Sequence, residues 1–375
     1  MRVLHFFKTY LPQSVGGIEQ VIYQLCRNSP AHGIRSDVLT LSAETEPRTL
    51  IHDGHQVHRA RLDFQLASTG FSFEAPGRLR ELAAEVDIVH YHFPWPFMDL
   101  AHFLTGMDKP TVVTYHSDIV RQRALLRLYK PLMHRFLGSV DRIVATSPNY
   151  LETSPVLKHY RDKVRIIPIG IDREGYPPPE AHRLAHWRQQ VGERFFLFVG
   201  VMRYYKGLHI LLEALRGTDY PVVIVGAGPL EQQLRNQAAA LGLTRVLFLG
   251  RIAEEDKVAL LKLSSAIVFP SHLRSEAFGI SLLEGAMFGK PMISSEIGTG
   301  TSYINIHGET GLVVPPSDPD AFREAMAFLW NNPAEASAMG ARAEQRYEHL
   351  FTAAEMGLQY ASLYRELLAS KRKTR

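Results

Sequence analysis

Short apolar runs with the character of buried strands alternate in this chain with segments whose apolar residues recur at helical spacing. In the first half such runs lie at 37–41, 87–92, 110–116 and 142–147, and a second series begins at 195–200. Strands that alternate with helices form parallel sheets covered on both faces, and ligands bind at the carboxyl ends of the strands. The sequence therefore predicts an α/β protein whose functional residues follow its strands.

A proline-rich segment separates the two series of strands. Three consecutive prolines, at 177–179, follow the run Gly170-Ile171-Asp172, and they cannot continue a helix or a central strand. A chain of 375 residues is long for one domain and has ample material for two cores. We therefore predict domains at 1–172 and 173–351, joined by this linker.

The composition limits the compartment and the partners. Lys and Arg outnumber Asp and Glu by 42 to 38, a mild excess that suggests acidic ligands or an anionic surface, and we expect no nucleic acid among the partners. Cys26 is the only cysteine, so no intrachain disulfide is possible and a cytoplasmic protein is favoured. The apolar run Val3–Phe7 is too short for a secretory signal.

The stretch Ser275–Ala286 carries a carboxylate at each end of one predicted helical segment. Glu276 and Glu284 are eight positions apart, about two turns, so both can face one cleft. Gly279 lies just inside the start of the segment, which follows a buried-strand run at 266–271. A helix N-terminus at a strand end suits a phosphate, and the carboxylates suit sugar hydroxyls. The alternative is an amphipathic helix with two solvated glutamates.

A second loop carries positive charge at the end of a strand. After Val199 the chain places Arg203 and Lys206 in a loop, and Gly207 lets a helix start at Leu208. An Arg that binds two oxygens, together with the compact charge of a Lys, suits a leaving diphosphate. The alternative is that both are ordinary surface residues.

Two features of the first half also lie where a ligand is expected. Gly16-Gly17 opens a helix after the first strand, which either lets the backbone approach a phosphate or sugar or is a plain tight turn. His116 ends the strand at 110–116, where a role in a site is favoured over a structural one. Asp118 either orients this histidine or caps the next helix.

Taken in order along the chain, these motifs resemble those of the retaining glycosyltransferases of family 4. Besides the segment from Glu276 to Glu284, the Ile167–Asp172 run, the loop with Arg203 and Lys206, and the Gly308–Leu312 run match the pattern of that family. The resemblance implies the GT-B fold, two Rossmann-like domains with parallel sheets that face a central cleft. It also implies that the last helix, at 352–375, packs back on the first domain.

The same resemblance implies roles for individual residues. Catalysis would depend on His116, which approaches the transferred sugar, on Arg203 and Lys206 at the donor pyrophosphate, and on Glu276 at the hydroxyls of the sugar. Glu284 would hold the ribose. Donor contacts are further expected from the following residues: Gly16, Gly17, Arg251, Ile252, Ala277, Phe278, Gly279 and Ile280.

The segment Thr301–Asn305 looks like the subgroup that handles GDP-mannose or GDP-rhamnose in bacterial O-polysaccharide synthesis. We expect retaining transfer of mannose or D-rhamnose from a GDP-sugar to a lipid-linked glycan of O-antigen or lipopolysaccharide, alongside other polysaccharide-assembly transferases. Two alternatives stay open. One is another GT-B enzyme that uses a UDP-sugar, either a hexosyltransferase or an epimerase, and the other is a non-catalytic synthase subunit.

Two short motifs are ambiguous. Asp318-Pro319-Asp320 is the only Asp-x-Asp of the chain; it matches a metal-binding pattern, but it precedes a predicted helix at 321–330, where Asp is a usual N-cap and Pro a usual first-turn residue. We favour the cap, and we expect no metal and no other cofactor. Gly226-Ala227-Gly228 is followed by Glu231, where a dinucleotide site needs glycine, so it lies near the donor nucleotide or is only a turn.

The predicted helix at 119–137 is basic and amphipathic. Its charge comes from Arg121, Arg123, Arg127, Lys130, His134 and Arg135. Such helices bind anionic bilayer surfaces, which would place the enzyme on the inner face of the cytoplasmic membrane, beside a lipid-linked acceptor. The alternative is a solvated basic face over a normal core face.

Overall fold

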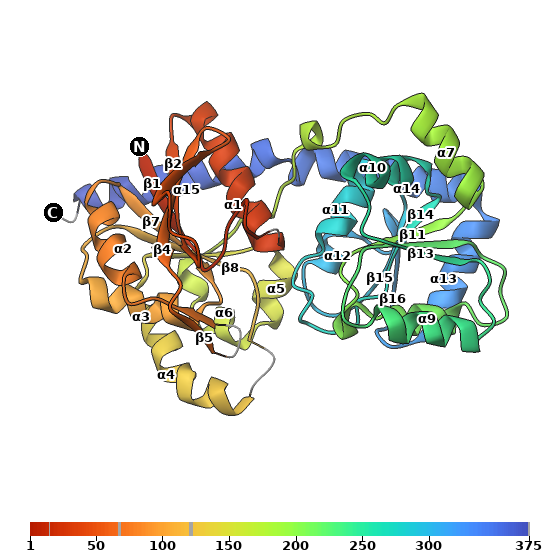
Figure 1. Ribbon diagram of the computed structural model, residues 1–375, viewed down its shortest axis with the longest axis horizontal. Helices are drawn as coiled ribbons and strands as arrows, with labels where there is room; N and C mark the ends of the chain where they lie inside the picture. The colour runs from red at the N-terminus through yellow and green to blue at the C-terminus, as the bar shows by residue number, and fades with distance from the viewer. Residues whose placement is uncertain (15, 67–68, 120–122, 374–375) are drawn as a thin grey trace. The chain divides into compact units, whose positions relative to one another are not determined.

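The computed structural model describes residues 1–14, 16–66, 69–119 and 123–373. The chain forms two compact units (Figure 1): unit 1 comprises Met1–Gly170 and Ala353–Arg375, and unit 2 comprises Ile171–Thr352. Each unit has its own sheet with helices on both faces, so the predicted α/β class is confirmed. Within the described residues, no helix is long and apolar enough to cross a bilayer.

The sheet of unit 1 has the strand order β10-β9-β8-β7-β1-β2-β4-β3 and is parallel except for its last strand. The chain starts at β1 in the middle, builds outward on one side, and returns to build on the other. The strand order therefore reverses beside β1, where α/β sheets form their binding crevices. The strands are β1 (Arg2–Phe6), β2 (Arg35–Ser42), β3 (Thr49–His52), β4 (His55–Arg61), β7 (Ile88–Phe93), β8 (Thr111–Tyr115), β9 (Arg142–Ala145) and β10 (Val164–Ile166).

Among the described residues, seven α-helices accompany this sheet. The C-terminal helix α15 packs against α1, whereas α2, α3 and α4 pack in sequence against one another. A small antiparallel hairpin, β5–β6, lies beside α3. These elements are α1 (Gly17–Asn28), β5 (Phe64–Leu66), β6 (Thr69–Phe71), α2 (Ala75–Ala84), α3 (Pro96–Thr105), α4 (Arg123–Ser139), α5 (Pro148–Thr153), α6 (Pro155–His159) and α15 (Ala353–Lys373).

The sheet of unit 2 is entirely parallel, in the order β13-β12-β11-β14-β15-β16. Its core packs the apolar side chains of β11, β12 and β14 against helices α8, α9, α13 and α14. The elements are α7 (Ala181–Val191), β11 (Phe196–Val199), α8 (Leu208–Ala214), β12 (Val222–Val225), α9 (Glu231–Ala240), β13 (Val246–Gly250), α10 (Glu254–Leu263), β14 (Ala266–Phe269), α11 (Ile280–Met287), β15 (Met292–Ser295), α12 (Thr301–Ile304), β16 (Gly311–Val314), α13 (Pro319–Asn331) and α14 (Pro333–Leu350).

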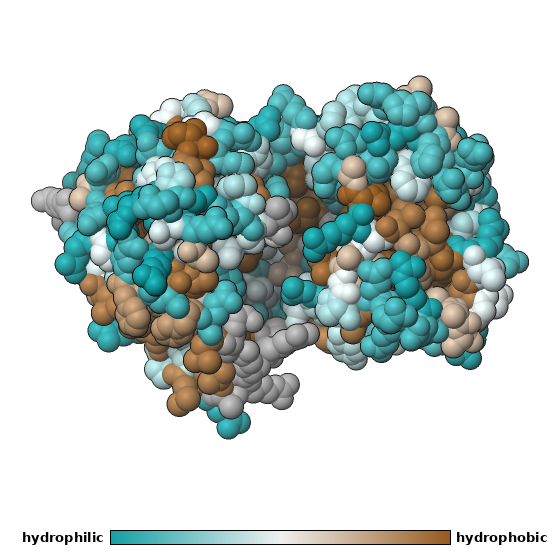
Figure 2. Space-filling model, viewed as in Figure 1, coloured by the Kyte–Doolittle hydropathy of each residue, from teal (hydrophilic) through white to brown (hydrophobic). Residues whose placement is uncertain are grey.

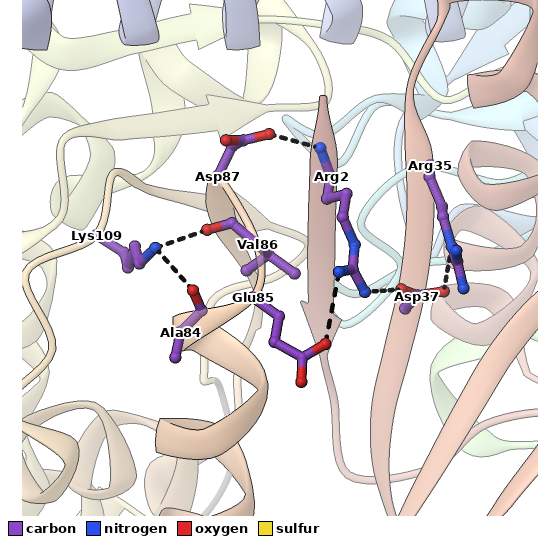
Figure 3. A network of polar contacts seen from close by, with 8 residues as sticks. All are labelled: Arg2, Arg35, Asp37, Ala84, Glu85, Val86, Asp87 and Lys109. Atoms are coloured by element: carbon purple, nitrogen blue, oxygen red, sulfur yellow. Dashed lines mark hydrogen bonds and ion pairs between the residues drawn. The ribbon is translucent and has the colours of Figure 1, made fainter.

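A charged network joins the loops at the amino-terminal ends of the strands of unit 1 (Figure 3). The backbone N–H of Arg2 donates to Asp87 at 2.7 Å, and its guanidinium lies 3.5 Å from both Asp37 and Glu85. Lys109 donates to two backbone carbonyls of the loop before β7, at 3.3 and 2.9 Å. These charges are paired with one another, and Lys109 satisfies two backbone carbonyls, so this edge of the sheet serves stability.

The tight start of α8 gives a stability prediction. Gly207 and Gly217 both have left-handed backbone, with φ of +70° and +72°, so alanine at either position costs about 1 kcal/mol in strain. A Cβ on Gly207 would also lie 1.9 Å from the carbonyl oxygen of Pro270, whereas a Cβ on Gly217 would meet nothing within 4 Å. Gly207→Ala should therefore destabilise by roughly 2 kcal/mol more than Gly217→Ala.

Thermal unfolding of the two variants, followed by circular dichroism, measures this difference. Equal shifts in Tm would show that the loop after β14 moves away from position 207 at no cost.

Candidate functional site

The loops after β11 and β14 bring two of the predicted catalytic residues into contact. Lys206 Nζ lies 2.5 Å from Glu276 Oε2, and it lies over the ring of Phe269, 5.0 Å from the centroid. The hydroxyl of Ser271 donates to the same carboxylate at 3.3 Å. Arg203 is exposed at the start of the same loop. The carboxyl ends of two neighbouring strands therefore present two cations and a buried carboxylate.

The prediction that Glu276 and Glu284 share one helix is wrong. Helix α11 begins at Ile280, and Gly279 before it has a φ of +103°, which cannot continue a helix. Glu276 lies in the preceding loop, where its N–H donates to the carbonyl of Leu273. The loop thus places Glu276 beside Lys206 and leaves the first N–H groups of α11 without intrahelical acceptors.

The neighbouring residues of that loop are anchored to the segment before α12. The carbonyl of Ala277 accepts a hydrogen bond from the N–H of Gly300 at 2.9 Å. The ring of Phe278 is buried, and a Cβ on Gly300 would lie 2.4 Å from it. These predicted donor-binding residues therefore hold the loop in place through one carbonyl and one ring.

Glu284 is buried on α11 and is held by two residues that sequence reasoning missed. The hydroxyl of Tyr176 and Nζ of Lys257 each lie 2.9 Å from the same oxygen, Oε1. Burial lowers the pKa of Lys257, but Glu284 and Glu254 outweigh it and raise that pKa overall, so the lysine is charged. Both contacts fall on Oε1, which leaves Oε2 for a ligand. A tyrosine in the linker and a lysine on α10 carry no spacing signal that points to Glu284.

The glycines after β12 have a packing role. A Cβ on Gly226 would lie 2.1 Å from the carbonyl oxygen of Gly200, and one on Gly228 would lie 2.5 Å from that of Met202. The pair lets the loops after β11 and β12 pack against each other, which favours the turn interpretation. Arg251 is exposed and Ile252 is half-buried directly after β13, so both follow a strand end of the same sheet.

The Asp-x-Asp motif is a helix cap, as predicted. Oδ1 of Asp318 accepts the N–H of Ala321 at 2.9 Å at the start of α13. Asp320 pairs with Arg323 one turn later, at 2.8 Å. Both carboxylates therefore have local partners in the helix that they open.

In unit 1, Gly16 is the N-cap residue of α1, which begins at Gly17. Glu19 is buried in the first turn and accepts hydrogen bonds from the hydroxyls of Thr9 and Ser14, both at 2.9 Å. A Cβ on Gly16 would lie 2.5 Å from Oε2 of Glu19. The glycine therefore makes room for the carboxylate that fixes the loop after β1.

His116 directly follows β8 and is buried. Its backbone N–H donates to the carbonyl of Phe93. Nε2 of its ring lies 3.0 Å from Nδ1 of His92. Burial lowers the pKa of His116 to about 3, so its ring is neutral. Asp118 accepts hydrogen bonds from the hydroxyls of Tyr115 and Ser154, at 2.9 and 2.6 Å. These contacts tie its carboxylate to β8 and to the start of α6.

An apolar patch lies on unit 1 over α3, α4 and the β5–β6 hairpin (Figure 2). Among the large apolar side chains of this region, those of Phe73, just after β6, and Leu128, on α4, are 84% and 80% exposed. Residues 120–122 of the predicted basic helix lie outside the described residues, and α4 runs from Arg123 to Ser139. The basic side chains of Arg127, Lys130 and Arg135 on α4 are exposed beside the patch. The patch consists of Phe64, Leu66, Phe73, Leu100, Leu104, Leu125 and Leu128.

Comparison with known proteins gives consistent results. A family model described as Glycosyltransferase Family 4 matches residues 15–174, and one described as Glycosyl transferases group 1 matches residues 184–346. The D-rhamnosyltransferase WbpZ of Pseudomonas aeruginosa is 72% identical over 94% of this chain and 93% of its own length. The O-antigen chain mannosyltransferase C of Escherichia coli is 51% identical over 99% of this chain and 100% of its own.

Among solved structures, a sucrose-phosphate synthase from Thermosynechococcus elongatus superposes with a TM-score of 0.79 at 22% identity. The match covers 98% of this chain and 99% of that one. At this identity the likeness concerns the fold.

The buried histidines of unit 1 predict acid lability. Burial lowers the pKa of His5 and His116 to about 3, and those of His90 and His92 well below 6.5. In the unfolded chain these four rings take up protons near pH 6.5, whereas in the folded protein they stay neutral at this pH. Stability is therefore full above about pH 6.5 and falls below it, by roughly 1.3 kcal/mol for each histidine between about pH 7.5 and 5.5.

Urea unfolding at the two pH values measures this loss. His5→Leu should remove the share of one histidine from the pH dependence. An equal pH dependence in wild type and His5→Leu would contradict the assignment of a buried neutral ring.

Proposed function

The chain belongs to glycosyltransferase family 4 and has the GT-B fold, and from this membership we propose that it transfers mannose or D-rhamnose from a GDP-sugar. The acceptor is a lipid-linked glycan in O-antigen synthesis. The names of the two close relatives, a D-rhamnosyltransferase and an O-antigen mannosyltransferase, support the sugar and the pathway. The structural observation that best supports the proposal is the contact between Lys206 and Glu276, which lies beside Arg203.

Lys206 and the neighbouring Arg203 provide the positive charge that the reaction needs. As the bond between the anomeric carbon and the diphosphate oxygen breaks, negative charge grows on the diphosphate. Arg203, Lys206 and the first N–H groups of α11 stabilise it. Lys206 then exchanges its contact with Glu276 for the phosphate, and Glu276 accepts hydrogen bonds from the sugar hydroxyls. The free Oε2 of Glu284 accepts the ribose hydroxyls, while Tyr176 and Lys257 hold the other oxygen.

Membership of the family and the pairing of the buried glutamates support a proposal for the stereochemical course. The two buried glutamates of unit 2 are each paired with a lysine, which suits them to binding hydroxyls. We propose that the acceptor oxygen attacks the anomeric carbon from the face that the diphosphate leaves, so the configuration is retained. The proton of the acceptor hydroxyl passes to the leaving phosphate. His116 of unit 1 orients the transferred sugar.

We also propose that transfer needs no divalent metal. The support is that Asp318 caps α13 and Asp320 pairs with Arg323, so the Asp-x-Asp motif is committed to its helix. Activity should be unchanged after treatment with EDTA, and loss of activity that Mg²⁺ or Mn²⁺ restores would contradict this.

Thermal stabilisation by nucleotides tests the donor. A ligand at 100 times its Kd adds about 2.7 kcal/mol to native stability, so the melting temperature should rise with GDP and remain unchanged with UDP or ADP. A shift with UDP alone would overturn the choice of donor. The absence of any shift would favour a non-catalytic synthase subunit.

Replacement of Arg203 tests the phosphate site. Arg203→Ala removes a charge-assisted contact that strengthens in the transition state, and turnover should fall by about 100-fold or more. Arg216→Ala is the matched control, because Arg216 is an exposed arginine of the same unit that pairs with Glu213. Turnover close to wild type in Arg203→Ala would remove this residue from the mechanism.

We further propose that the apolar patch and the basic residues of α4 bind the inner face of the cytoplasmic membrane. The support is that Leu125 and Leu128 are exposed on the same helix as Arg127, Lys130 and Arg135. Exposed apolar side chains can enter the interface of a bilayer while neighbouring cations contact its anionic headgroups.

Co-sedimentation with liposomes tests the membrane surface. Recovery should be greater with anionic than with neutral lipids, and Leu128→Glu should reduce it. Leu358→Glu is the control, since Leu358 is 49% exposed on α15, outside the patch. Equal recovery with both lipids would contradict the proposal.

A further inference from the structure

Three buried histidines form a hydrogen-bonded row across neighbouring strands of unit 1. Nδ1 of His5 on β1 lies 3.0 Å from Nε2 of His92 on β7, and Nδ1 of His92 lies 3.0 Å from Nε2 of His116 after β8. The exposed fractions of the three residues are 1%, 0% and 6%. The row therefore runs through the interior to the residue that the proposed function places at the transferred sugar.

A second row lies on the same face of the sheet and involves His90. Its Nδ1 lies 2.7 Å from the hydroxyl of Tyr364, and its Nε2 lies 2.7 Å from that of Thr114. The hydroxyl of Thr114 also forms a hydrogen bond with the hydroxyl of Tyr360, at 2.7 Å. This row connects the middle of the sheet to α15 and does not include His116.

The same cluster has the composition of a metal site, but both ring nitrogens of His90 and of His92 are already hydrogen-bonded. Ring nitrogens of His5, His90 and His92 lie within 4.8 Å of one another. Both nitrogens of His90 contact hydroxyls, and both nitrogens of His92 contact histidines. An ion would have to break these hydrogen bonds, so the cluster is better explained by hydrogen bonding.

The number of protons limits how the first row can be arranged. Burial lowers the pKa of each ring, so each is neutral and carries one proton, and each link needs one donor and one acceptor. Two arrangements satisfy both links. Either His5 donates to His92 and His92 donates to His116, or both links run in the opposite direction.

The inner end of the row separates the two arrangements. Nε2 of His5 is buried and has no hydrogen-bond partner among the described residues. If the links ran inward, this atom would carry a buried N–H without an acceptor, the rarer defect in folded proteins. If they run outward, it is only an unused lone pair. The outward direction leaves the proton of His116 on Nδ1.

We propose that His5 and His92 are positioning residues that fix the proton of His116 on Nδ1. His116 then offers a neutral N–H donor to an oxygen of the transferred sugar and has no free lone pair with which to act as a base. This inference rests on the proposed role of His116 at the sugar, but the position of the proton is a property of the free protein.

Long-range ¹H–¹⁵N spectra of protein labelled with ¹⁵N-histidine test the proposal directly, because protonated and bare ring nitrogens are well separated. The His116 signals are assigned from their absence in His116→Gln. Wild type should show the proton on Nδ1. A proton on Nε2 would overturn the proposal, whatever the activity of the enzyme.

Substitutions at position 92 separate positioning from packing. His92→Leu removes the donor to Nε2, so His116 should lose its single tautomer, and kcat/KM should fall by roughly tenfold. His92→Asn keeps an amide N–H near the position of Nδ1 and should restore both the tautomer and most of the activity. The same spectrum and activity in His92→Leu as in wild type would contradict the role of the row.

Thr114→Val is the matched control, because it breaks the row of His90 and leaves the first row intact. It should lower stability without changing the tautomer of His116. If the proton lies on Nδ1 but none of the variants changes transfer, the row stands and the role of His116 at the sugar fails.

Discussion

The direction of the parallel strands determines where polar side chains of this protein are available to bind a ligand. The inner strands of both sheets are buried on both faces, so polar side chains within them must find partners inside, and side chains that bind ligands must follow their carboxyl ends. Lys206, Glu276 and His116 all follow strands in this way. The opposite ends of the strands of unit 1 carry the network of ion pairs and hydrogen bonds around Arg2 and Asp87. In the proposed function, one edge of a sheet therefore serves binding and the opposite edge serves stability.

Buried charge in unit 2 is tolerated because it is paired. Glu276 and Glu284 are each at least nine-tenths buried, and each contacts a lysine. A carboxylate buried without a partner would cost several kcal/mol. The two pairs differ in their surroundings, since Lys206 lies beside the exposed Arg203 whereas Tyr176 also holds Glu284. The first pair is therefore suited to exchange partners with a ligand, and the second is suited to hold its carboxylate still.

The sequence predicted what depends on local pattern. Continuous apolar runs predict strands β7, β8, β11 and β14, which the structure contains. The residues next to Asp318 predict its role as a helix cap, which is also confirmed. Strand β4 was missed because its buried positions include His55, His58 and Arg59, which disguise it. Glu276 was placed on a helix because spacing alone does not reveal the positive φ of Gly279. Tyr176, Lys257 and the histidine row depend on register between distant segments, and no local pattern reports register.

The two units solve different electrostatic problems. In the proposed function the leaving diphosphate carries several charges, and unit 2 offers Arg203 and Lys206, cations that are exposed or exchangeable. A sugar is neutral, and a charged imidazolium buried near it would cost more than its hydrogen bond returns. Under that proposal unit 1 needs a neutral donor of fixed direction, and a lone neutral histidine does not have one, since its proton can sit on either nitrogen. In our proposal the row formed by His5, His92 and His116 removes that ambiguity without adding charge.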